Sequence, residues 1–248
     1  MVRSSKSSSD DSLSYAERTR DDANAIKQFI HNDRFDFATS IFQQFSSQRS
    51  LSTLDFGAGD GELIRRLAKL TSEDLVAYEP APTFQAQLAQ NLSQSLGARI
   101  VSNLSQITDQ FDIIFCLEVL EHLPRESLNS TIETIKHLLK DDGVFVLSVP
   151  HEIHLPALAK GIFRMVRRFG AFDAQPINVF RATMGWKIYR PLSQMSDHLP
   201  YHFDHIGFDY RELEALCATH FSEIKRTFRP IPIVGSLFNS EVYFILRK

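Results

Sequence analysis

Short apolar segments alternate with helical patterns through the middle of the chain. We expect strands at residues 51–56, 74–79, 98–102, 111–117 and 144–149, and helices at residues 62–70, 83–92 and 126–139. The helical segments repeat their apolar residues at helical spacing, whereas the strand segments are short and apolar. Strands that alternate with helices predict a doubly wound, mainly parallel α/β sheet, with ligands at the carboxyl ends of its strands.

The two ends of the chain add to this sheet. Residues 16–45 show a helical pattern in two pieces that meet near His31, and a late helix begins at Tyr210. Two final strands are expected at residues 223–228 and 241–246. After the fifth strand the alternation stops for about 55 residues, and a stretch of this length is expected to be a functional insertion such as a lid.

Length and composition indicate a single domain. The chain has 248 residues, of which 43% are hydrophobic, so it can bury one substantial core. We expect a disordered tail rich in Ser and Asp at residues 1–14 and a single domain at residues 15–248. Within that domain we expect N-terminal helices at 15–48, a ligand-binding core at 50–150 and the insertion at 151–205.

Charge and cysteine content narrow the functional classes. The formal net charge of -3 gives no global field that would attract nucleic acid or an anionic membrane. Cys116 and Cys217 lie far apart, which predicts buried thiols in a reducing compartment and no disulfide framework. Residues 1–14 lack the apolar region of a secretory signal, and no apolar run approaches the ~18 residues of a membrane span. We therefore expect a cytoplasmic protein, at most peripheral to the membrane.

Residues 54–62, LDFGAGDGE, are the strongest ligand signal. An apolar lead-in and an acid are followed by three alternate glycines at the end of the first strand. Gly57 and Gly59 remove side chains where a ligand must lie against backbone, and Gly61 would let the next helix start close to the sheet. Glu79 follows the second strand about 20 residues later, where a carboxylate can accept hydrogen bonds from both ribose hydroxyls. The spacing predicts a nucleotide site.

Glu62 separates two nucleotide classes. A carboxylate in the first turn of the helix would repel a pyrophosphate but tolerate a ligand with a cationic amine and a sulfonium. The pattern D-x-G-x-G-x-G at residues 55–61 resembles the first motif of class I S-adenosylmethionine-dependent methyltransferases. The likeness continues through residues 111–124, which are similar to the small-molecule and ubiquinone-biosynthesis O-methyltransferase branch, and residues 138–150.

The resemblance implies a Rossmann-like sheet of seven strands, one of them antiparallel, with an insertion after strand five that shapes the acceptor site. It implies S-adenosyl-L-methionine as cofactor, S-adenosyl-L-homocysteine as product, and O-methylation of a small-molecule, glycan or lipid-linked acceptor. The cofactor-binding positions that it implies are Asp55, Gly57, Ala58, Gly59, Glu79, Pro80, Asn103, Leu104, Leu117 and Glu118.

Individual roles follow from the same resemblance. Asp55 would face the methionine amine and Glu79 the ribose, while Asn103 and its neighbour would flank the adenine. Glu118 would line the methyl end. Arg34 is a candidate for the methionine carboxylate.

Histidines near strand ends are the candidates for a general base. Methyl transfer is an in-line displacement, so the protein must align the reactants and remove a proton if the acceptor is a hydroxyl. An imidazole with a pKa near ~6.5 can do so at neutral pH. The first choice is His151, nearest the end of the fifth strand, followed by His122 and His205; His154 and His202 are further histidines of this region.

A metal site is the alternative reading of the same region. Glu118, Glu121 and His122 have helical-turn spacing, and His205 could complete a mixed carboxylate and imidazole site. This set resembles that of metal-dependent small-RNA 2′-O-methyltransferases, but the Glu-His pair is also common in metal-free relatives. Because the charge is near neutral and no basic patch is interleaved with aromatic residues, we expect neither a metal nor a nucleic-acid partner.

Residues 155–169 predict a basic amphipathic helix. One face would carry Leu155, Leu158, Ala159, Ile162, Met165, Val166 and Phe169, and the other Lys160, Arg164, Arg167 and Arg168. The first expectation is a cover helix with its apolar face on the core and its cations in water. The alternatives are a membrane-surface lid that admits a lipid-linked acceptor, and a site for a phosphorylated or glycan acceptor.

Two other functions stay open. A catalytically silent protein of this fold would bind the nucleotide or a partner without turnover. A nicotinamide dehydrogenase is disfavoured by Glu62 and by the lack of a second catalytic domain.

Overall fold

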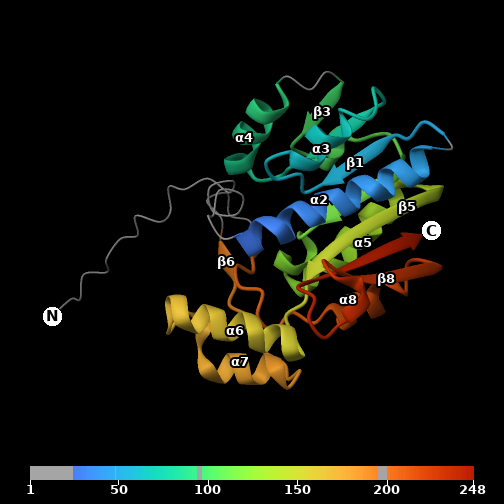
Figure 1. Ribbon diagram of the computed structural model, residues 1–248. Helices are drawn as coiled ribbons and strands as arrows, with labels where there is room; N and C mark the ends of the chain where they lie inside the picture. The colour runs from blue at the N-terminus through green and yellow to red at the C-terminus, as the bar shows by residue number, and fades with distance from the viewer. Residues whose placement is uncertain (1–24, 48, 94–96, 195–199) are drawn as a thin grey trace.

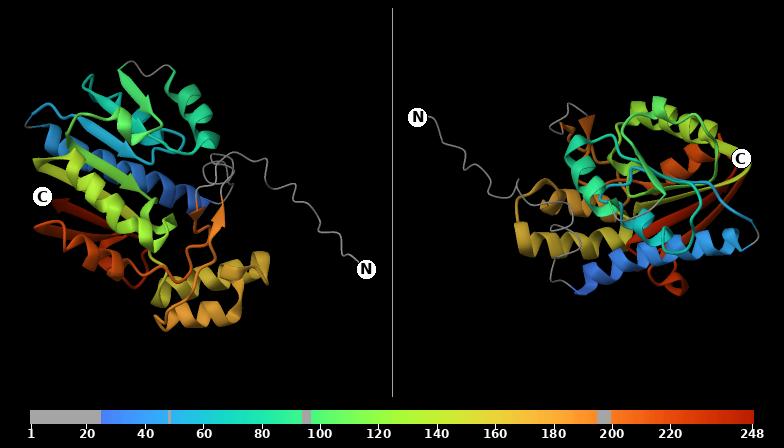
Figure 2. Two further views of the ribbon diagram at one scale, coloured as in Figure 1. Left: turned by 180° about the vertical axis from the view of Figure 1, so that it is seen from behind. Right: turned by 90° about the horizontal axis from the view of Figure 1, so that it is seen from above.

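The computed structural model describes residues 25–47, 49–93, 97–194 and 200–248 (Figure 1). The tail expected at residues 1–14 and the first part of the helical pattern expected at 16–45 lie outside the described residues. A central sheet is covered by helices on both faces, and a pair of helices projects beside it (Figures 1 and 2).

The sheet has seven strands in the order β3-β2-β1-β4-β5-β9-β8. Five strands are parallel: β1 (Thr53–Phe56), β2 (Leu75–Tyr78), β3 (Ala98–Val101), β4 (Phe111–Leu117) and β5 (Leu139–Pro150). Strand β9 (Glu241–Arg247) runs antiparallel to both of its neighbours, β5 and β8 (Glu223–Arg229). This confirms the doubly wound fold with one antiparallel strand. The strand order reverses between β1 and β4, where a ligand crevice is expected at the carboxyl ends.

The central strands are apolar because both faces of the sheet are covered. Alternate residues of β4 point to opposite sides: Ile114 and Cys116 belong to one core, Ile113 and Phe115 to the other. Helices α5 (Arg125–Leu138) and α8 (Tyr210–Cys217) cover the first core. Helices α2 (Ala25–Ser46), α3 (Glu62–Leu67) and α4 (Pro82–Leu92) cover the second. Both cysteines are buried and unbridged, as expected.

Helix α2 corrects one prediction. It continues without a break through His31, where the sequence suggested that two pieces meet. The polar residues at this point are held by distant partners: Asn32 accepts a hydrogen bond from Arg66, and Asp33 forms an ion pair with Arg229 of β8. These contacts satisfy side chains that would otherwise favour a turn.

The insertion after β5 has its own structure. It contains α6 (His154–Arg168), α7 (Pro176–Thr183) and a small hairpin of β6 (Ser193–Gln194) and β7 (Pro200–Tyr201). Helices α6 and α7 lie side by side in every view (Figures 1 and 2). A Cβ atom at Gly161 would lie 2.4 Å from Val179 Cγ1, so the absence of a side chain lets the two helices approach closely.

Helix α6 is amphipathic, but its orientation is the reverse of the expected cover helix. Val166 and Phe169 are 83% and 75% exposed. The side chains of Lys160 and Arg164 instead point inward, where they form ion pairs with the buried Glu152 at 2.9 and 2.8 Å. A buried carboxylate must be paired, and this requirement turns two cations of α6 towards the protein, while the two arginines at the end of the helix stay exposed. Within the described residues, no helix is long and apolar enough to cross a membrane.

Candidate active site

Three glycines form the turn after β1. Gly57, Gly59 and Gly61 all have positive φ angles, of 84°, 55° and 82°. The amide of Gly57 donates to the carbonyl oxygen of Tyr78 at 2.8 Å. A Cβ atom at Gly57 would lie 2.5 Å from Val119 Cγ2, whereas one at Gly61 would clash with Leu88 of α4 at 2.6 Å. Gly61 therefore allows close packing against α4, and not against the sheet as expected.

Glu79 is fixed against this turn from the end of β2. Its Oε2 accepts a hydrogen bond from the amide of Gly59 at 2.9 Å, and its Oε1 accepts one from the amide of Ala81 at 2.9 Å. Burial raises the pKa of this carboxyl, although the two backbone hydrogen bonds act in the opposite direction. The carboxylate is held in place before any ligand binds. The sequence predicted its position but not this second role as a tie between two turns.

Asp55 lies within β1, directly before the turn, and is 4% exposed. Burial, reinforced by the nearby charges of Glu79 and Asp60, raises its pKa to about 8. A cationic group bound next to Asp55 would stabilise its charged form and offset this cost. Its expected role beside an amine stays a prediction, and the electrostatics are compatible with it.

Asn103 follows β3 and caps a short 3-10 helix, Leu104–Gln106. Its side-chain oxygen accepts a hydrogen bond from the amide of Ser105 at 2.9 Å, and Gln106 accepts one from the amide of Asn103 at 3.1 Å. This capping box fixes the loop that carries Leu104. Asn103 can thus position the predicted adenine site through the backbone of this loop.

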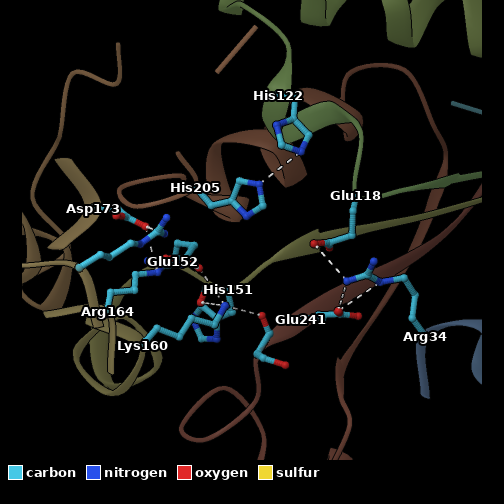
Figure 3. Close-up of polar contacts among 12 residues, drawn as sticks. Arg34, Glu118, His122, His151, Glu152, Lys160, Arg164, Asp173, His205 and Glu241 are labelled. Atoms are coloured by element: carbon cyan, nitrogen blue, oxygen red, sulfur yellow. Dashed lines mark hydrogen bonds and ion pairs between the residues drawn. The ribbon is translucent and has the colours of Figure 1, made fainter. Parts of the chain in front are cut away.

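Glu118 directly follows β4 in a strained conformation, with a φ angle of 55°. Its amide donates to the carbonyl oxygen of Ser148 at 2.9 Å. Its carboxylate lies 3.4 Å from Nη2 of Arg34, which also pairs with Glu241 of β9 (Figure 3). Arg34 therefore reaches the strand ends from α2, where it pairs with two carboxylates of the protein; its expected contact with the methionine carboxylate stays a prediction. Glu241 had no signal in the sequence, because an acid at the start of a strand is usually solvated.

Glu121, His122 and His205 form a compact cluster next to Glu118. The facing ligand atoms of these three residues all lie within 4.8 Å of one another. Nδ1 of His122 donates to the carbonyl oxygen of His202 at 2.7 Å, so a neutral His122 carries its lone pair on Nε2. That atom faces Nε2 of His205 at 3.3 Å (Figure 3).

The carboxylate of Glu121 is the unusual member of this cluster. It is fully buried, and within the described residues neither oxygen has a hydrogen-bond partner. Burial raises the pKa of Glu121 to about 8. One carboxylate and two imidazoles within reach of one point could hold a divalent cation. Glu118 does not belong to the cluster, because its carboxylate points to Arg34. The helical spacing that would align it with Glu121 is absent, since the 3-10 helix begins only at Leu120.

His151, the first choice for the base, is 1% exposed and packs between the rings of Tyr210 and Phe228, with centroids 5.1 and 5.7 Å away. Burial, together with the charge of Lys160, lowers its pKa to about 4. Such a ring is a weak base at neutral pH. Its catalytic role stays a prediction. Burial lowers the pKa of His122 and of His205 as well, so the preference for His122 rests on geometry: its Nε2 faces the cluster beside Glu118, whereas the ring of His151 is enclosed by aromatic rings.

The carboxylate of Glu62 is paired within the protein, which weakens the repulsion of a pyrophosphate that the sequence predicts. Its carboxylate accepts hydrogen bonds from Arg65 and Arg66 and is nearly buried. Burial would raise its pKa, but the two guanidinium groups outweigh it and hold the pKa below its usual value. Its charge is thus neutralised locally.

Comparison with known proteins identifies related chains. A family model described as "Methyltransferase domain" matches residues 29–209. The mitochondrial ubiquinone biosynthesis O-methyltransferase of Schizosaccharomyces pombe is 30% identical over 199 residues, which are 70% of this chain and 71% of that protein.

Solved structures share the fold. Magnesium protoporphyrin IX methyltransferase from Synechocystis PCC 6803, with bound S-adenosylhomocysteine, has a TM-score of 0.55 at 14% identity and covers 91% of this chain and 88% of its own. A small RNA methyltransferase has a TM-score of 0.60 at 16% identity, covering 88% of this chain and 26% of its own.

Proposed function

Because the chain belongs to the S-adenosylmethionine-dependent methyltransferases and uses S-adenosylmethionine as its cofactor, we propose that it methylates an oxygen of a small-molecule acceptor. The observation that carries this proposal is the tautomer of His122, that is, which ring nitrogen carries the proton. Its Nδ1 donates to a backbone carbonyl, so Nε2 is the ring nitrogen that can accept a proton, and in the structure it faces Nε2 of His205. An oxygen acceptor needs such a base, and the O-methyltransferase from S. pombe supports the same acceptor atom.

We assign the residues as follows. S-adenosylmethionine supplies an electrophilic methyl group when it is bound. Glu79 would hold the ribose, and Asp55 would offer a carboxylate to the methionine amine. His122, whose Nε2 faces Nε2 of His205, would take the hydroxyl proton once the acceptor replaces His205 there, while the acceptor oxygen would bond to the methyl carbon and the carbon–sulfur bond would break, leaving its electron pair on sulfur. The products are the methyl ether and S-adenosylhomocysteine.

The insertion at residues 151–205 is proposed to shape the acceptor site. Arg190 of this segment donates to the carbonyl oxygen of Glu121 at 2.7 Å, and His202 accepts the hydrogen bond from His122. The insertion thus contacts the proposed base directly. Closing or repacking it would alter both acceptor access and the orientation of His122.

A divalent cation at the cluster is the second candidate feature. The unpartnered carboxylate of Glu121 favours it, and Glu121, His122 and His205 would hold the ion. Such an ion would lower the pKa of an acceptor hydroxyl. Zn²⁺ or Mn²⁺ should then raise the unfolding temperature of the wild type but not of Glu121→Gln. Equal shifts in both proteins would argue against the site.

The proposed reaction is tested with methyl-labelled S-adenosylmethionine. The purified protein would be incubated with a catechol, an alkylated catechol or a cell lysate, followed by extraction with organic solvent. Label in the product that is absent in Glu79→Ala supports the enzyme. A protein that binds S-adenosylmethionine yet transfers no label to any acceptor would support the catalytically silent alternative.

A further inference from the structure

The outer surface of α6 is apolar although it faces solvent. Leu155, Ile162, Val166 and Phe169 lie along this side and are between 43% and 83% exposed. A helix that merely covered the core would bury these residues and expose its cations. Here the cations Lys160 and Arg164 are the inward residues, and both pair with Glu152. The orientation is therefore specified by buried ion pairs.

The apolar surface continues beyond α6. Helix α7 packs against α6 through Gly161 and Val179. Further exposed apolar residues follow on α7 and the segment after it, with exposed fractions between 49% and 84%: Ile177, Phe180, Met184, Trp186, Tyr189 and Leu192. We refer to the exposed apolar residues of α6, α7 and this segment as the α6–α7 surface. Proteins that stay monomeric in water rarely expose a patch of this kind.

The exposed charges of the segment that carries the α6–α7 surface have one sign. Residues 154–192 contain a single acid, Asp173, which is buried and paired with Arg164 and Arg168. Arg167, Arg181 and Lys187 are exposed on the same segment. The chain as a whole has a net charge of -3, so these cations form a local basic rim. Apolar side chains with a basic rim complement the acyl boundary and the headgroups of an anionic lipid surface.

Two aromatic residues strengthen this match. Trp186 and Tyr189 are 55% and 84% exposed, and the amine of Lys187 lies 5.9 Å from the centre of the Tyr189 ring. Trp and Tyr favour the interface between water and lipid, because one end of each side chain is apolar and the other polar.

We propose that the α6–α7 surface docks on an anionic lipid bilayer. α6 begins a few residues after the carboxyl end of β5, on the side of the sheet where His122 and Glu118 lie, so docking would bring the site close to the bilayer (Figures 1 and 3). The surface binds with its apolar residues in the headgroup region and its rim on the phosphates. This goes beyond methyl transfer, because docking requires neither cofactor nor acceptor.

The test is flotation of the full chain with phosphatidylcholine vesicles that contain or lack phosphatidylglycerol. The protein should float with the anionic vesicles only, and high salt should weaken binding. Val166→Ser/Phe169→Ser should lower the partition coefficient about tenfold, and Arg167→Glu/Lys187→Glu should also lower it. The control is Lys69→Glu/Leu70→Ser, which changes an exposed cation and an exposed apolar residue just beyond the end of α3.

Binding of S-adenosylhomocysteine checks that each variant is folded. Flotation that is absent, or equal for Val166→Ser/Phe169→Ser and the control, would overturn the proposal. A second outcome would also overturn it: the wild type binds no lipid but is a dimer, and Val166→Ser/Phe169→Ser makes it a monomer. The α6–α7 surface would then bind a second copy of this chain and not a bilayer. Flotation needs no turnover, so its failure is distinct from failure of the proposed methyl transfer.

Discussion

The Nε2 atoms of His122 and His205 face each other at 3.3 Å, although the two residues are 83 positions apart in the chain. His122 comes from the end of β4 and His205 from the insertion. Only one of the two facing nitrogens can carry a proton if both rings are neutral, and the hydrogen bond of His122 to His202 places that proton on His205. In the structure His205 therefore donates to Nε2 of His122, and an acceptor hydroxyl must replace this hydrogen bond before His122 can take its proton.

We predict that His122→Ala lowers kcat by about 10²- to 10⁴-fold, because a positioned base contributes that much to proton removal. The affinity for S-adenosylmethionine should stay unchanged, since His122 is not among the cofactor positions. Steady-state rates and calorimetric binding measure the two effects separately. His137→Ala, which changes an exposed histidine on α5, is the control. A kcat equal to that of the wild type would rule out His122 as the base.

Glu79→Gln should weaken cofactor binding. Glutamine keeps the shape of the side chain, but its NH₂ group cannot accept the hydrogen bond from Gly59 or Ala81. We expect the dissociation constant to rise by about 10- to 100-fold, corresponding to roughly 1.4–3 kcal/mol. Calorimetry with S-adenosylhomocysteine tests this, and Glu73→Gln on the exposed surface should bind as the wild type does.

The stability of the protein should depend on pH through Asp55. Its pKa in the folded state, about 8, lies above the ordinary value of 3.8, so the folded state binds a proton more tightly than the unfolded state. Stability is therefore lost as the pH rises from about 4 to about 8, by at most about 1.4 kcal/mol per pH unit. Asp55→Asn should reduce the change of the free energy of unfolding with pH over this range. Parallel curves for the two proteins would show that Asp55 is not the titrating group.

Glu118 should be replaceable by glycine at a smaller cost in stability than by alanine. Both substitutions remove the carboxylate near Arg34, but only glycine relieves the positive φ angle. The Gly variant should be more stable than the Ala variant by about 1 kcal/mol in chemical denaturation. At Glu133, in the middle of α5, the order should be reversed by a similar amount. The same order at both positions would contradict the strain at Glu118.

Much of the fold was predictable because its signals are local. The glycines of the turn, the apolar run of β4 and the acid after β2 each follow from neighbouring residues, and β4 was predicted with its observed bounds. The break expected in α2 was wrong because Asn32 and Asp33 are satisfied by Arg66 and Arg229, which are distant in the chain.

The site was less predictable where long-range contacts decide. The periodicity of α6 predicted an amphipathic helix but not which side chains turn inward, since that depends on the pairing of Lys160 and Arg164 with the buried Glu152. Likewise, the spacing of Glu118 and Glu121 predicted that their side chains point in the same direction. The positive φ of Glu118 sends the two carboxylates apart, and no local pattern predicts that angle.

The most direct test of the proposed reaction uses S-adenosylmethionine with a ¹³C-labelled methyl group and a catechol acceptor, followed by nuclear magnetic resonance of the product. We predict a new methyl carbon signal of an aryl methyl ether, formed together with S-adenosylhomocysteine, and a signal strongly reduced in His122→Ala. A methyl signal on nitrogen or carbon, or an O-methyl signal of equal rate in His122→Ala, would contradict base-assisted transfer to oxygen.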